Sequence, residues 1–193
     1  PMDLPRAVKF KPRKSLRNES IPKSAKQGRT YEDFLAFCAG NTDVPVTELD
    51  TVLGERGGKV IMTIHFVASD FMAGLLLDNK TAAEAANKIS RLKHDLALHG
   101  FVFGDIIPLL LTDNGGEFSC VSAFENNADG ERETNLFFCE PAAAYEKPHI
   151  EKNHTMFRDI VPKGQSFDNF TQETVNLIFS HVNAVKRNQF NGR

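Results

Sequence analysis

Residues 109–118 read LLLTDNGGEF, an apolar run that ends at Asp113 and is followed at once by an Asn-Gly-Gly turn. A buried strand that delivers a carboxylate to the mouth of a loop can present a metal ligand beside a polyanionic substrate. Asp-Asn-Gly clusters are also ordinary strand-ending turns, because each of these residues tolerates the backbone angles of a turn. The stretch therefore indicates an active site only if further carboxylates converge on Asp113.

The composition is that of one globular domain with an appended arm, since 41% of the 193 residues are hydrophobic and 25% are charged. No apolar run approaches the ~20 residues that cross a bilayer, and the N-terminus has no secretory signal pattern. The three cysteines are far apart and lack a Cys-x-x-Cys spacing, which argues against a disulfide framework and a zinc site. We expect a soluble, unsecreted protein.

Residues 1–30 carry nine Lys or Arg against Asp3 and Glu19, so their net charge is about +7 and that of the remainder about -9. They also contain four prolines and almost no apolar periodicity. We expect a flexible or extended basic arm that binds phosphates non-specifically, with a solvated linker as the alternative. Residues 31–193 are then the core domain.

The hydrophobic pattern of the core predicts five strands. The first three follow one another closely, as in an antiparallel meander, and the expected ranges are 46–53, 60–66, 71–77, 106–112 and 136–139. Pro108 is a warning that the fourth strand is irregular in its first half.

Helices are predicted between and around these strands. Thr81 and Glu84 have the spacing of a capping box, and helical periodicity continues from there to Gly100. The other expected ranges are 31–37, 119–125, 148–161 and a last helix from about residue 171. One α/β domain with a mixed five-stranded sheet flanked by helices is the economical architecture, and this arrangement is ribonuclease H-like.

Asp50 lies in the middle of the first predicted strand, in the run ELDTVLG at residues 48–54. An aspartate at mid-strand disfavours the strand unless another interaction offsets the cost. A bound cation would do so, whereas a solvent-facing place on an edge strand is the plainer alternative. If Asp113 ends the fourth strand, its expected neighbour is the first strand and therefore Asp50.

A third carboxylate, Glu151, lies in the helix predicted to start at Pro148. Glu151, His154, Thr155 and Arg158 are spaced i, i+3, i+4 and i+7, so they share one face of that helix. A simple amphipathic helix would show the same spacing. The polar face becomes a site if it lies near the two aspartates.

Three carboxylates held close together repel and raise one another's pKa unless a divalent cation neutralises them. Oxygen-only ligands favour Mg²⁺ or Mn²⁺ over zinc. Two such ions, about 3.5–4 Å apart, would activate an attacking oxygen and stabilise the leaving oxygen of an in-line phosphoryl displacement. The sequence thus favours metal-dependent chemistry on nucleic-acid strands.

The chain resembles the catalytic core of transposases of the insertion-sequence-thirty family, within the wider group of integrases with a two-aspartate, one-glutamate site. The resemblance covers about residues 45–190. It is carried by four motifs in order, which are ELDTVLG at 48–54, TDNGGEF at 112–118, EKNH at 151–154 and FRDIVPKG at 157–164.

This resemblance implies a ribonuclease H-like fold with Mg²⁺, replaceable by Mn²⁺, held by Asp50, Asp113 and Glu151. It implies hydrolytic nicking of DNA ends and attack of the 3′-hydroxyl on target DNA, by an oligomer that works at the nucleoid in the bacterial cytoplasm. It also places Arg158 where such enzymes contact DNA. Further DNA-contact candidates rest on charge and position, and they are Lys147, His149, Lys152 and Lys163.

Two departures from the family pattern are visible. Asp113 and Glu151 are 38 positions apart, a little more than is typical, and we assign the excess to the polar loop after Asn126. The family's N-terminal helix-turn-helix region has no counterpart, because a 30-residue arm is too short to contain it. We therefore expect a fragment of a longer transposase.

Two alternatives stay open. A stand-alone nuclease of the ribonuclease H or junction-resolving type would use similar carboxylates but would only hydrolyse its substrate. A DNA-binding module that has lost catalysis would bind no metal.

Overall fold

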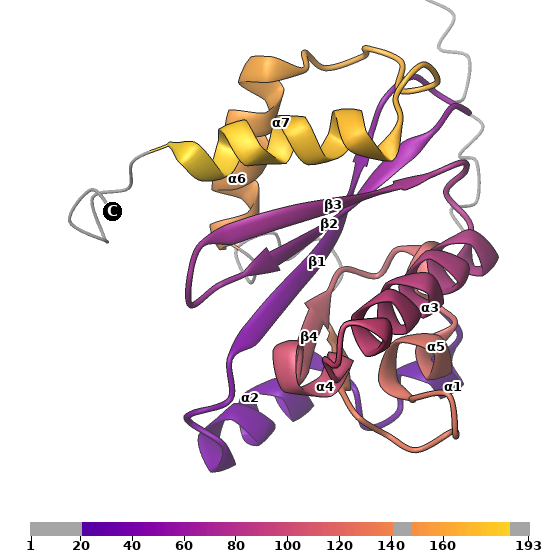
Figure 1. The fold of residues 1–193 in the computed structure, drawn as a ribbon. Coiled ribbons are helices and arrows are strands. Elements are labelled where there is room, and N and C mark those ends of the chain that lie inside the picture. Colours follow the sequence, from indigo (N-terminus) through magenta and orange to yellow (C-terminus); the bar gives the residue numbers. More distant parts are fainter. Residues whose placement is uncertain (1–20, 141–147, 186–193) are drawn as a thin grey trace, which may run out of the picture.

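The computed structural model describes residues 21–140 and 148–185, without the side chains of Pro148, His149, Glu151 and Lys152. Its centre is a five-stranded sheet of order β3-β2-β1-β4-β5 (Figure 1). The strands are β1 (Val46–Leu53), β2 (Val60–Phe66), β3 (Phe71–Leu77), β4 (Leu109–Thr112) and β5 (Asn135–Phe138). β1, β2 and β3 form an antiparallel meander, whereas β4 is parallel to both β1 and β5. This mixed order is the ribonuclease H-like topology predicted from the sequence.

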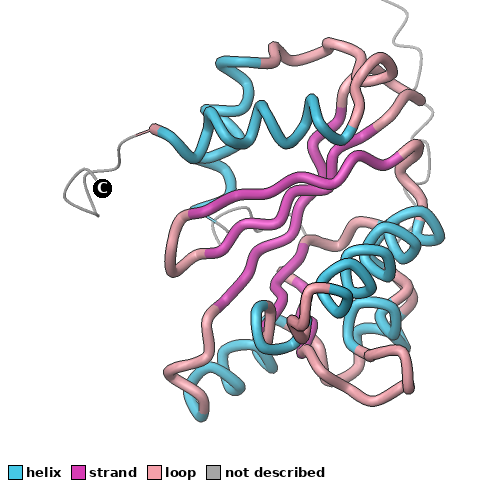
Figure 2. The backbone as a smooth tube through the Cα atoms, viewed as in Figure 1, coloured by secondary structure: helices cyan, strands magenta, loops and turns pink. Residues whose placement is uncertain are grey.

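Helices cover both faces of the sheet (Figures 1 and 2). On one face lie α6 (Pro148–Ile160) and α7 (Gln172–Ala184), and α2 (Tyr31–Gly40) packs on the β4–β5 part of the same face. The opposite face carries α1 (Lys23–Lys26), α3 (Ala82–Leu98), α4 (Phe103–Ile106), the 3-10 helix η1 (Gly116–Phe118) and α5 (Val121–Glu125). In the described parts of the chain, no helix is long and apolar enough to cross a membrane.

Alternate side chains of each strand point to opposite faces of the sheet and so pack against opposite helical layers. In β1, Leu49 packs with α3 and α5, whereas Val52 packs with Phe157 of α6 and Phe179 of α7. Glu48 and Asp50 lie an even number of positions from Val52, so they project toward the α6 face as well. Asp50 therefore projects toward the face of the sheet that is covered by α6, the helix that contains Glu151.

The helix starts follow from local capping. Thr30 and Asp33 form a reciprocal capping box at the start of α2. At α3, the Thr81 hydroxyl accepts a hydrogen bond from Glu84 N, as the sequence predicts. The Glu84 carboxylate accepts from Asp78 N, so it caps the preceding turn.

The fourth strand is shorter than predicted. Residues 103–106 form α4, and β4 begins only at Leu109, because Pro108 has no N–H for a sheet ladder. α1 and α4 are too short for hydrophobic periodicity to predict. In α7, Val175, Ile178 and Val182 are buried, whereas Val185 follows the helix end and is exposed.

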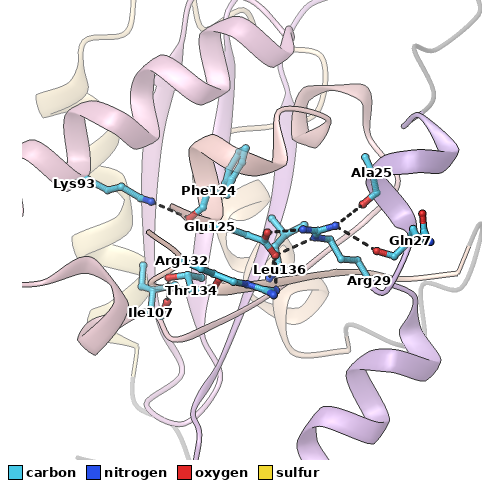
Figure 3. A network of polar contacts seen from close by, with 10 residues as sticks. All are labelled: Ala25, Gln27, Arg29, Lys93, Ile107, Phe124, Glu125, Arg132, Thr134 and Leu136. Atoms are coloured by element: carbon cyan, nitrogen blue, oxygen red, sulfur yellow. Dashed lines mark hydrogen bonds and ion pairs between the residues drawn. The ribbon is translucent and has the colours of Figure 1, made fainter. Parts of the chain in front are cut away.

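The end of the predicted basic arm packs on the core. Ile21 is buried among side chains of the α3 face, and α1 follows it. The Arg29 guanidinium donates two hydrogen bonds to the Glu125 carboxylate, at 3.0 and 2.7 Å (Figure 3). This contact raises the pKa of Arg29. Residues 21–30 therefore belong to the folded unit, whereas residues 1–20 lie outside the described part of the chain.

Glu125 is the centre of this contact network. It is 3% exposed, and its Oε1 also accepts hydrogen bonds from the Arg132 guanidinium and from Leu136 N (Figure 3). One carboxylate thus joins the chain before α2, the loop after α5 and the start of β5.

We expect Glu125→Ala to lower the free energy of unfolding by about 3 kcal/mol, because it leaves two guanidinium groups and a buried N–H without their acceptor. Urea denaturation measures the change. Glu131→Ala, at an exposed glutamate of the neighbouring loop, is the matched control and should stay within about 0.5 kcal/mol of the unchanged protein. Equal effects of the two variants would contradict the role of Glu125.

Candidate active site

Asp50 and Asp113 come from neighbouring parallel strands. Leu49 pairs with Thr112 in the β1–β4 register; Asp50 is the next residue of β1, and Asp113 directly follows the end of β4. Adjacent strands lie about 4.8 Å apart, and residues in register project to the same face. Both aspartates are partly exposed, with 25% of the Asp50 side chain accessible. The sheet thus brings together two of the three predicted carboxylates at an accessible position.

The turn after Asp113 is fixed at both ends. Gly115 N donates a hydrogen bond of 3.1 Å to Asp113 Oδ1, which holds the carboxylate against its own loop. The Asn114 amide donates to Cys139 O, just after β5. The Asn-Gly-Gly segment therefore serves as a shaped turn and as the support of Asp113.

Glu117, which follows this turn, is buried and bonded to residues outside it. It is 2% exposed, and its Oε1 accepts a 2.7 Å hydrogen bond from the Thr51 hydroxyl and lies 3.1 Å from Lys80 Nζ. A Cβ at Gly115 would lie 2.5 Å from the same carboxylate, so any larger residue there would displace Glu117. Glu117 is thereby occupied with structural partners.

His154 on α6 reaches Asp50. Its Nε2 lies 3.0 Å from Thr63 Oγ1, and its Nδ1 lies 4.0 Å from Asp50 Oδ2. The Thr63 hydroxyl also donates to Asp50 O at 3.2 Å. The polar face of α6 therefore adjoins the aspartate of β1, which the helical spacing alone left undecided.

Glu151 lies in the helical backbone of α6 one turn before His154, and its side chain lies outside the described part of the structure. Among the described side chains, no group of three or more His, Cys, Asp or Glu is arranged to hold a metal. The donors that are described fit Mg²⁺ or Mn²⁺, since Asp50 and Asp113 both offer carboxylate oxygens, come from neighbouring strands and are partly exposed. The complete three-carboxylate site stays a prediction.

The predicted DNA contacts divide into three groups. Lys147 lies outside the described residues, as do the side chains of His149 and Lys152. Lys163 is exposed in the loop after α6. Arg158 is half-buried, and its Nη2 donates a 2.7 Å hydrogen bond to Leu53 O at the end of β1. Burial lowers the pKa of Arg158. Contact with DNA stays a prediction for all five.

Sequence reasoning missed several residues that shape the site. Thr63 joins Asp50 to His154, and Thr51 holds Glu117, yet isolated threonines in strands are too common to stand out. The run VIMTIHF of β2 offers a clearer sequence signal, because His65 is its only titratable residue and most of its neighbours are apolar.

Sequence comparison finds two curated relatives. An ORF3 protein of Spiroplasma virus SpV1-R8A2 B, named as an integrase, is 28% identical over 136 residues, which are 70% of this chain and 39% of that protein. The transposase for insertion sequence element IS4351 of Bacteroides fragilis is 24% identical over 140 residues, or 70% of this chain and 38% of that protein. The chain is related to integrases and transposases. This confirms the resemblance seen in the motifs, although the chain spans about two-fifths of the length of either relative.

No protein-family model matches the chain. Among the solved structures that resemble it, two have a TM-score of 0.45 each. One is a simian T-cell lymphotropic virus intasome in complex with PP2A regulatory subunit B56 gamma, with 13% identity over 70% of this chain and 48% of that chain. The other is the catalytic core domain of BIV integrase, with 16% identity over 74% of this chain and 84% of that chain. The fold assignment rests on the strand order, because similarity at this level adds nothing to it.

Proposed function

We propose that this chain is the catalytic core of a DNA transposase, which nicks DNA ends and joins the freed 3′-hydroxyl to target DNA. The observation that carries the proposal is the β1–β4 register, in which Leu49 pairs with Thr112 so that Asp50 and Asp113 each directly follow a paired residue, with α6 packed on the same face of the sheet. Two partly exposed carboxylates on neighbouring strands repel each other unless cations bind there, and bound cations would in turn hold a phosphodiester. The integrase and transposase relatives support the same chemistry.

In this proposal Asp50, Asp113 and Glu151 hold Mg²⁺, for which Mn²⁺ can substitute. The bound metal would activate the attacking oxygen and stabilise the leaving oxygen of an in-line phosphoryl displacement. The residues of the chain have positioning roles. Gly115 N orients the Asp113 carboxylate, and Thr63 links the backbone of Asp50 to His154.

DNA is the proposed partner, with the element ends and the target bound by a homo-oligomer. Lys147, His149, Lys152, Arg158 and Lys163 are the candidate contacts to its phosphates. The basic residues before Ile21 would add non-specific affinity. A recognition domain outside residues 31–193 would select the ends, and the protein would act at the bacterial nucleoid.

The test uses the full-length parent protein with Mg²⁺ and a labelled duplex that carries a terminal repeat of its element. Denaturing gels should show a nick at the repeat and a longer strand-transfer product. RNA–DNA hybrid and four-way junction substrates are assayed in parallel. Hydrolysis of either one without strand transfer would identify a stand-alone nuclease, and DNA binding without any cleavage would identify an inactive module.

A further inference from the structure

A buried polar chain lies beside the site and links α6 to the sheet. It consists of Glu48 in β1, His65 in β2, Asp70 in the β2–β3 turn and Asn153 in α6. Each of the four is at most 3% exposed. Buried carboxylates are costly unless they are paired or hydrogen-bonded, so a set of this size calls for a role.

Two hydrogen bonds and one longer His65–Glu48 contact, which is not a hydrogen bond, link the four side chains. His65 Nε2 lies 2.8 Å from Asp70 Oδ1, and His65 Nδ1 lies 3.4 Å from Glu48 Oε2. At one end of the chain, Asn153 Nδ2 donates a 2.8 Å hydrogen bond to the same Asp70 oxygen. At the other end, Glu48 Oε2 accepts a 2.9 Å hydrogen bond from Ile150 N.

Both ends of this polar network, Glu48 and Asn153, are therefore attached to the first two turns of α6. Ile150 N is one of the N–H groups in the first helical turn that have no acceptor within the helix. Glu48 accepts the hydrogen bond from Ile150 N and so caps the helix from strand β1. Its negative charge also lies at the favourable end of the helix dipole.

The backbone of Asp70 supports a role beyond filling space. Its φ of 54° is the one positive value at a non-glycine residue in the described part of the chain. A left-handed conformation is unfavourable for residues with a side chain, and it persists where the surroundings over-determine it. Here it points a buried carboxylate at both His65 and Asn153.

Glu151 lies between the two anchored positions, one residue after Ile150 and two before Asn153. We infer that the Glu48–His65–Asp70–Asn153 chain is a positioning device that sets the height and rotation of α6, and with it the place of Glu151 relative to Asp50. The inference rests on the proposed function, since it gives Glu151 a metal to hold. None of the four residues needs to touch metal or DNA for this role.

Swapping the side chains of Asp70 and Asn153, which are hydrogen-bonded to each other, tests the inference. Asn153→Asp places a second carboxylate against Asp70 and should weaken Mn²⁺ binding by about tenfold or more, as loss of an outer-shell partner does at metal sites. Asp70→Asn together with Asn153→Asp restores the hydrogen bond in the opposite direction, with the second N–H of the amide at position 70 donated to His65 Nε2 and the imidazole proton carried on Nδ1 toward Glu48. Asparagine also tolerates the left-handed conformation at residue 70, so this double variant should bind Mn²⁺ within about threefold of the unchanged protein.

Isothermal titration calorimetry with Mn²⁺ gives the affinities, and far-UV circular dichroism checks that each variant is folded. Hydrogen exchange of the metal-free proteins gives a second readout. In Asn153→Asp, amides of residues 150–156 should exchange faster while those of α7 are unchanged. If Asn153→Asp does not fold, Asn153→Ala takes its place with the same expectations for the single variant and no rescue by Asp70→Asn.

Unchanged Mn²⁺ affinity in a folded single variant would overturn the inference, and so would a folded double variant that fails to recover it. Asp113→Asn is titrated alongside to judge the proposed function separately. If Asp113→Asn binds Mn²⁺ normally, the proposed metal site is wrong, and the exchange of α6 amides still decides whether the polar chain anchors the helix. If Asp113→Asn loses Mn²⁺ and Asn153→Asp does not, the inference alone fails.

Discussion

Asp113→Asn should reduce DNA nicking and strand transfer by about 10³-fold, since loss of a metal-binding carboxylate removes several kcal/mol of transition-state stabilisation. The fold should survive the change. The amide is close in size to the carboxylate, and its oxygen can still accept the hydrogen bond from Gly115 N. The loss therefore reflects charge and metal affinity more than the shape of the turn.

The nicking assay on a terminal-repeat duplex measures the rate for the full-length parent protein with each substitution. Asp129→Asn is the matched control, because Asp129 lies exposed in the loop after α5 and the same change there should leave the rate unaltered. A rate for Asp113→Asn within about tenfold of the unchanged enzyme would show that Asp113 is not a metal ligand of the rate-limiting step.

Phe157→Ala should lower the free energy of unfolding by about 3–5 kcal/mol, the usual cost of truncating a fully buried phenylalanine. The Phe157 ring is completely buried on the inner side of α6. It stacks on Phe179 of α7 at 5.5 Å between ring centroids, and it meets Phe167 edge-on at 6.2 Å. Its loss leaves a cavity between α6 and α7, which the surrounding rings fill only in part.

Urea denaturation measures the loss, and Ile160→Ala is the control on the same helix. Ile160 is 44% exposed, so its truncation should change the free energy of unfolding by about 0.5 kcal/mol or less. A loss below about 1 kcal/mol in Phe157→Ala would mean that α6 is not seated on the sheet by this aromatic cluster.

The sheet was predictable because its strands carry their information locally. The runs that became β1, β2 and β3 are dense in apolar and β-branched residues and are separated by turn residues, so their bounds agree with the sequence-based prediction. β4 began later than predicted, because Pro108 interrupts an apolar run that periodicity alone reads as continuous. The helices α1 and α4 have four residues each, which is too short for a hydrophobic periodicity to appear in the sequence, and they depend on tertiary packing.

The sequence singled out the two aspartates of the candidate site, whose role as metal ligands stays a prediction. Asp113 and Asp50 stand out because a carboxylate at the end or middle of an apolar strand is costly. The contacts that support them are different, since Glu48, His65, Asp70 and Asn153 are distant in sequence and meet only when β1, β2 and α6 pack together. No spacing rule connects residues that come from three separate elements and a turn.

The most direct test of the central claim is anomalous diffraction from a crystal of this chain soaked in Mn²⁺. The account predicts an anomalous peak between the carboxylates of Asp50 and Asp113, with the Glu151 carboxylate as a further ligand. In an isomorphous crystal of Asp113→Asn the peak should be lost or strongly reduced. A well-ordered soaked crystal with no peak at the two aspartates, or with manganese bound only elsewhere, would contradict the claim.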